Sequence, residues 1–218
     1  MGQGGAFALL PEAGTAPVTS QAGRDFGSGD ALEKLLGETF AGIGEVTEQR
    51  KKFCRFLGSL GSHDLSVMRE ALGFPERVVG VSVNDPFYSA IFEYKNAKDG
   101  TRFAVTYESG IDAVPDFDAH LAVYGERKRV IIRYDSPFIK GLPIKVTVQE
   151  VNEHGEMETR EVLGSYEDAF TTELKELYEC LVNGRAIKTT VEDAAMDMKL
   201  FDMMYKGWET EKTRSGIS

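Results

Sequence analysis

The sequence predicts an α+β protein with an open, mainly antiparallel sheet of about six strands and helices packed on one face. Apolar residues follow helical spacing up to residue 72, alternate with polar ones from Val78 to Leu163, and return to helical spacing from Phe170. The alternating stretches are joined by short turns, and a parallel pair would need a crossover of a dozen or more residues. Alternation also gives each strand one apolar face, so we expect helices on that face alone.

Composition limits the class of protein. The chain has 218 residues, of which 42% are hydrophobic and 28% charged, which is typical of a soluble globular protein. The formal net charge of −10 argues against binding nucleic acid or an anionic membrane through a basic field. No apolar run approaches the ~20 residues of a membrane span, and the N-terminus lacks the basic region of a signal peptide. Cys54 and Cys180 lie in helical patterns and indicate buried thiols in a reducing compartment, so we expect a cytoplasmic protein.

The first 29 residues are expected to form a flexible arm. They are rich in Gly, Ala, Ser and Thr, and cannot bury enough apolar surface to offset their ordering entropy. The glycines at positions 2, 4 and 5 follow no strand, so they do not predict a phosphate-binding loop. Asp30 is expected to cap a short helix over residues 31–36. The folded domain is expected to span residues 30–208, with a polar tail over 209–218.

Two helices are predicted before the sheet. The first runs from Glu45 to Leu57, and Gly58 and Gly61 are expected to break it. The second begins near His63 and ends at Gly73, a residue type favoured just past a helix end. On this stretch alone, the interpretation of His63 as a capping or core histidine is favoured over that of a functional residue.

The alternating region divides at its turns. Strands are expected around residues 78–84, 88–94, 102–107, 119–123, 130–134, 144–149 and 158–163. One face is mixed, since it carries Thr106, Arg133, Lys145 and Thr147, and it is large enough to meet a partner or a second sheet. Two helices follow: Phe170 to Leu181 forms an apolar stripe that ends at Asn183-Gly184, and Thr189 with Glu192 resembles a capping box that opens the last helix.

The order of these motifs resembles a known family. Gly61-Ser62-His63-Asp64-Leu65 precedes the sheet, Asn183-Gly184-Arg185 links the closing helices, and Thr190-Val191-Glu192-Asp193-Ala194 opens the last one. Together they resemble the C-terminal domain of the glucose–fructose oxidoreductase / inositol dehydrogenase / MocA (Gfo/Idh/MocA) family over residues 30–208. The resemblance implies a preceding Rossmann domain that binds NAD or NADP in full-length relatives. It also implies hydride transfer with a sugar or polyol substrate, and a homo-oligomer formed through the sheet face.

The resemblance also suggests site residues. His63 matches the family's active-site histidine, a proton-transfer or substrate-orienting group, and a histidine suits that task because its unperturbed pKa is about 6.5. The family often has an aspartate four residues earlier; here that position is Ser59, which can hydrogen-bond but carries no charge near neutral pH. Tyr107 and Tyr124 are further substrate-binding candidates because an aromatic ring can stack on a sugar, and core packing is the alternative for both.

Three functions stay open. The first is a substrate-side domain that cannot transfer hydride alone, because the chain shows no strand–Gly-x-Gly-x-x-Gly–helix unit and so no cofactor-binding residues. The second is a non-enzymatic assembly module that pairs through its sheet with itself or with a Rossmann-containing paralogue. The third is a cofactor-free lyase or isomerase that uses His63 and a carboxylate. Asp64 is a poor partner for it, since adjacent helical residues point about 100° apart.

An acidic loop is the remaining candidate for a binding site, in this case for a metal ion. Asp112, Asp116, Asp118 and His120 are metal-ligand types, but their spacing does not match a calcium loop. We therefore expect a solvated loop and no metal. The basic cluster at residues 127–129 is too short to indicate nucleic acid.

Overall fold

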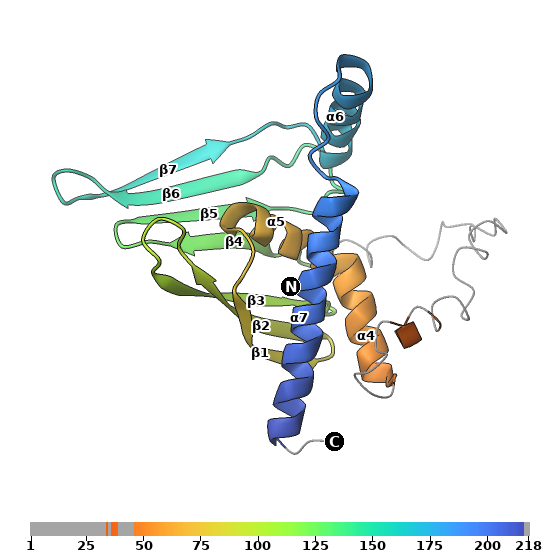
Figure 1. Cartoon of the computed structure of the whole chain (residues 1–218). Helices are drawn as coiled ribbons and strands as arrows, with labels where there is room; N and C mark the ends of the chain where they lie inside the picture. Colours follow the sequence, from red (N-terminus) through yellow and green to blue (C-terminus); the bar gives the residue numbers. More distant parts are fainter. Residues whose placement is uncertain (1–33, 35, 39–45, 216–218) are drawn as a thin grey trace. The chain divides into compact units, whose positions relative to one another are not determined.

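The computed structural model describes residue 34, residues 36–38 and residues 46–215 (Figure 1). The predicted arm and most of the predicted short helix lie outside this part of the chain. The described residues form two compact units: residues 111–190 make one, and the residues up to 110 join those from Val191 onward in the other. No helix among them combines the length and apolar character needed to cross a bilayer.

The unit that contains His63 begins with one unbroken helical path. Helix α4 (Glu48–Phe56) leads into a π-helix, η1 (Leu57–Gly61), and then into α5 (Ser62–Leu72). Thr47 caps α4, with its hydroxyl accepting from the Arg50 amide at 3.3 Å. The predicted break at Gly58 and Gly61 is therefore wrong. The predicted end at Gly73 is confirmed, and its φ of 83° is one that glycine adopts without strain.

The spacing of buried residues explains the π-helix. Phe53, Leu57, Gly61 and Leu65 are all buried and follow one another in steps of four. In an α-helix each such step overshoots a full turn by about 40°, or about 120° over three steps. A π turn closes i→i+5 hydrogen bonds and holds more residues per turn, so it keeps the four on one face.

Three antiparallel strands follow in the order β1-β2-β3: β1 (Arg77–Asn84), β2 (Phe87–Lys95) and β3 (Arg102–Gly110). Cross-strand partners share a face, so Val81, Ala90 and Tyr107 lie in one row on the buried side. Figure 1 shows α4 and α7 (Val191–Ser215) side by side on this sheet. The prediction of one covered face is confirmed for this unit.

An aromatic cluster joins the helices to the sheet. The Phe53 ring stacks on Tyr88 at 5.5 Å and meets Tyr205 and Trp208 edge-on at 5.3 and 5.6 Å. Helix α7 extends through Ser215, past the expected start of the polar tail. Glu209 in this part of α7 pairs with the buried Arg50 at 2.6 Å.

The other unit contains four antiparallel strands in the order β4-β5-β6-β7: β4 (Ala119–Tyr124), β5 (Lys128–Tyr134), β6 (Lys145–Val151) and β7 (Met157–Leu163). Helix α6 (Ala169–Asn183) follows. The Asp168 carboxylate caps it by accepting from the Thr171 amide at 3.0 Å, and Gly184 ends it with a φ of 67°.

The α+β class and the antiparallel pairing are confirmed, but the number of sheets differs from the expectation. The structure has two sheets, of three and four strands, in place of one sheet of about six. Residues 111–118, between β3 and β4, form no strand. Alternation identifies strands one at a time, whereas the ladder between two strands depends on contacts that alternation does not report.

Candidate functional site

His63 lies in the first turn of α5, directly after the π-helix, and its side chain is exposed to solvent. It makes no hydrogen bond to any residue that the structure describes. Gly61, the residue before α5, provides no side-chain cap. An exposed imidazole without a protein partner does not fit the core or capping alternative, so it is free to meet a ligand.

Ser59 is exposed and stands four residues before His63. Its hydroxyl donates to the Arg55 carbonyl at 2.7 Å, and the Ser62 hydroxyl donates to the Ser59 carbonyl at 2.9 Å. The two serines thus bond to backbone carbonyls in and beside the π-helix, where the regular i→i−4 pattern is interrupted. The Ser59 oxygen keeps its lone pairs and can still accept a hydrogen bond from a ligand.

Tyr107 lies on the buried face of β3 and is 6% exposed. Its hydroxyl is fully enclosed and has no hydrogen-bond partner among the described residues. Burial raises the pKa of this phenol well above its usual value. A weak hydrogen-bond interaction with the Ser109 side chain, outside standard geometry, opposes the rise in pKa, and the nearby negative charge of Asp64 adds to it. A ring so enclosed offers no face on which a sugar could stack, so the core-packing alternative fits Tyr107.

Tyr124 belongs to the other unit and is 69% exposed. The Arg129 guanidinium, from the partner position on β5, lies 5.7 Å from the centre of its ring. The exposed ring is open to a stacking ligand, whereas the buried Tyr107 is not. The two tyrosines, which the sequence suggested as equivalent candidates for substrate binding, therefore differ in exposure, and only Tyr124 has an accessible ring.

Asp64 follows His63 inside α5. Because the helix begins at Ser62, the two side chains leave it about 100° apart. The negative charge of the half-buried Asp64 contributes, after burial, to raising the pKa of the Tyr107 phenol. This arrangement weighs against an acid–base pair of His63 and Asp64.

The acidic side chains of the loop contact nearby basic side chains. The His120 Nδ1 lies 3.3 Å from an Asp118 carboxylate oxygen, and the Arg133 guanidinium lies 3.6 Å from the same oxygen. All three side chains are exposed. Within the described ranges, no three His, Cys, Asp or Glu side chains are grouped closely enough to hold a metal ion.

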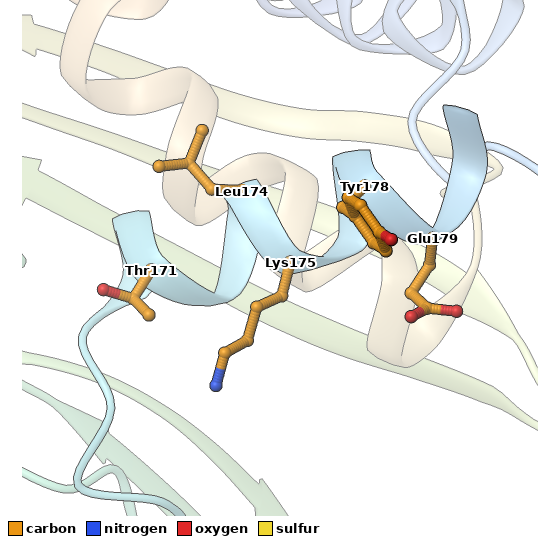
Figure 2. A pocket seen from close by; sticks show the side chains of 5 residues that line it. All are labelled: Thr171, Leu174, Lys175, Tyr178 and Glu179. Carbon is orange, nitrogen blue, oxygen red and sulfur yellow. The ribbon is translucent and has the colours of Figure 1, made fainter. Parts of the chain in front are cut away.

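An open hollow of about 510 Å³ lies on α6, lined by Thr171, Leu174, Lys175, Tyr178 and Glu179 (Figure 2). All five side chains come from this one helix. A recess with a single wall cannot enclose a small molecule from several sides, as binding pockets usually do. It belongs to the exposed surface of α6, which has no buried residue.

The described residues thus combine two antiparallel sheets, two closing helices and an exposed histidine in the first turn of α5. The comparison with protein families matches residues 46–214 to the C-terminal alpha/beta domain of an oxidoreductase family, Gfo/Idh/MocA. The chain belongs to this family, and the match runs from before α4 into the last turns of α7. Comparisons with curated proteins and with solved structures gave no match.

Proposed function

We propose that this chain is the substrate-side domain of an NAD- or NADP-dependent oxidoreductase for a sugar, a polyol or a related carbonyl compound. The observation that carries the proposal is the family match over residues 46–214, within which the exposed His63 lies in the first turn of α5. In this role His63 exchanges a proton with the substrate oxygen whose carbon gains or loses hydride. An imidazole suits this step because it can take up and release a proton near neutral pH.

The described residues do not fit the nucleotide itself. A Rossmann site lies at the carboxyl ends of parallel strands that lead into helices, with a glycine-rich turn against the pyrophosphate. Every strand pair in both sheets is antiparallel. Hydride transfer by this chain therefore depends on a Rossmann domain outside the described residues, within a longer protein or in a separate paralogue.

Calorimetry and reconstitution test this function. The 218-residue chain is titrated with NAD(H) and NADP(H) separately, and we expect no micromolar binding. It is then combined with a Rossmann domain of the same family and assayed against a panel of sugars and polyols. His63→Asn should lower the restored turnover by about 10²-fold or more, which is the usual contribution of a general acid–base group.

His154→Asn is the matched control, since His154 lies in an exposed turn of the other unit. It should leave turnover unchanged. Tight binding of either nucleotide by the isolated chain would contradict the proposal, and so would equal activity of the His63 variant and the control.

An assembly role is the second candidate, and the surface of α6 favours it. Its large apolar side chains are exposed, with Leu174 at 66%, Tyr178 at 58% and Leu181 at 74%. Contiguous exposed apolar surface commonly marks a place where proteins associate. In this role the chain associates through α6, or through its sheet as the family resemblance implies, with a second copy or with a Rossmann-containing paralogue. Light scattering after size exclusion should then show a dimer or larger assembly, whereas a monomer at all concentrations would count against self-association.

A further inference from the structure

The π-helix between α4 and α5 controls where His63 points. A π turn contains one residue more than the α-helical turn it replaces, so every residue after it is rotated by about 100°. If Leu57–Gly61 relaxed to an α-helix, α5 would either turn its buried Leu65 and Met68 away from the core or move His63 to another side. The direction of His63 therefore depends on what holds this five-residue segment in its π form.

Tyr107 meets the π-helix at Gly61. A β-carbon built on Gly61 would lie 2.9 Å from the Tyr107 hydroxyl oxygen, 3.2 Å from Leu57 Cδ2 and 3.4 Å from Phe56 Cε1. The first distance is too short for an unstrained contact, so the hydroxyl already fills the space that a side chain at Gly61 would need. The φ of Gly61 is −61°, which any residue adopts. Close approach of the tyrosine is thus the reason for a glycine here.

The Ser109 side chain is close enough to lower the pKa of the Tyr107 phenol, but no hydrogen bond of standard geometry holds the Tyr107 hydroxyl in this place. It is buried and has no partner in the part of the chain that the structure describes. Buried polar atoms normally have a partner, and one without it calls for an explanation. The explanation that the geometry offers is steric: the hydroxyl extends the ring by one atom, and that atom lies 2.9 Å from where a β-carbon of residue 61 would stand.

We propose that Tyr107 is a positioning residue for His63. Its hydroxyl rests on Gly61, keeps Leu57–Gly61 in the π form, and so sets the direction in which the first turn of α5 presents the imidazole. What His63 does in that position rests on the proposed function. The contact itself is independent of it.

Tyr94 provides a matched control for the hydroxyl. It also lies on the buried face of the same sheet, is 2% exposed, and has a buried hydroxyl without a hydrogen-bond partner among the described residues. Its ring stacks on Phe103 at 5.3 Å, and its hydroxyl is not among the three closest atoms to a β-carbon on Gly61. Tyr94→Phe thus removes the same group from the same core without removing the contact with the π-helix.

The test is a double-mutant cycle with NMR as the readout. The chain contains three histidines, so imidazole signals can be assigned to His63, His120 and His154 by single replacements. Tyr107→Phe and Gly61→Ala should each shift the His63 signal and the amide signals of residues 57–61. His120 and His154, in the other unit, should be unchanged. Tyr94→Phe should leave the His63 signal where it is.

The double variant gives the sharpest result. A methyl group on residue 61 can occupy the space that Tyr107→Phe vacates, so the double variant should restore the His63 signal toward its wild-type position. Gly61→Ala alone should lower the melting temperature by roughly 2–10 °C through overpacking, and the double variant should recover most of that loss. If Gly61→Ala does not fold, recovery of a folded double variant supports the contact in the same way.

The proposal is overturned if Tyr107→Phe leaves the His63 signal unmoved, or if the effects of the two single changes simply add. None of these measurements uses substrate or nucleotide. A positive cycle without reconstituted turnover would leave the positioning role in place and reject the proposed function. Reconstituted turnover with a negative cycle would support the proposed function and reject the positioning role of Tyr107.

Discussion

Arg69 on α5 and Asp193 in the first turn of α7 form a two-point ion pair. The guanidinium Nη1 and Nη2 lie 2.7 and 2.9 Å from the two carboxylate oxygens, and Nε donates to Asp197 one turn further at 2.9 Å. Arg69 and Asp197 are both 13% exposed. These bonds tie the helix that carries His63 to the last helix of the chain.

Arg69→Ala is expected to destabilise the protein, because it leaves two neighbouring carboxylates without their shared cation. Breaking a buried pair costs about 3–5 kcal/mol, and the partial exposure of Asp193 reduces our expectation to about 1–3 kcal/mol. Arg77→Ala is the control, since it removes an exposed arginine with a similar two-point bond to Glu93 and should change stability little. Urea unfolding curves of the two variants measure the difference. Equal unfolding midpoints would contradict a stabilising role for the Arg69 ion pair.

Gly207→Ala is expected to lower stability by about 1–3 kcal/mol through overpacking. A β-carbon on Gly207 would lie 2.9 Å from Val78 Cγ1 and 3.2 Å from Val81 Cγ2, where α7 rests on β1. A β-carbon on Gly58, in the π-helix, would have nothing within 4 Å. Gly58→Ala should therefore be neutral or stabilising, because alanine lowers the entropy cost of helical backbone. Thermal melts that rank the two variants in the opposite order would argue against this close packing.

Stability should fall as the pH rises from about 10 to 12. Burial raises the pKa of Tyr88 and of Tyr94 to about 12, above the value of about 10 for an exposed phenol. Below pH 10 both phenols are neutral in the folded and unfolded chains, and their contribution is complete. Between the two values only the unfolded chain ionises, which favours unfolding. Denaturant curves at several pH values measure the decline.

Tyr94→Phe isolates this effect from other alkaline changes. Phenylalanine cannot ionise, so the variant should lose less stability than the wild type over the same pH interval. Identical declines for the two proteins would show that Tyr94 is not the source.

His63→Ala should leave the free energy of unfolding within about 0.5 kcal/mol of the wild type, as is usual for an exposed position. Leu65→Ala, two residues further along α5, should cost about 2–5 kcal/mol because Leu65 is fully buried. Chemical melts compare them. A large loss for His63→Ala would restore the interpretation of His63 as a core residue.

Local patterns in the sequence determined much of the secondary structure and the family of this protein. Period-two alternation, together with a turn at residues 153–155 before the last strand, placed a strand near each of the seven in the described residues, and Asn183-Gly184 marked the end of α6. The grouping of Gly61–Leu65 with the closing helices was enough to suggest the family that residues 46–214 confirm. These features are readable because each depends on residues a few positions apart, where side-chain direction and capping follow directly from backbone geometry.

Tertiary structure alone decided the rest. Nothing near Gly61 in the chain reveals that the Tyr107 hydroxyl would lie only 2.9 Å from a β-carbon at this position. A glycine that suggested a helix break therefore lies inside a continuous helix. The division of the strands into two sheets and the pairing of Arg69 with Asp193 are likewise contacts between distant segments. Such contacts depend on which surfaces meet when the chain packs, and neither periodicity nor local propensity specifies that meeting.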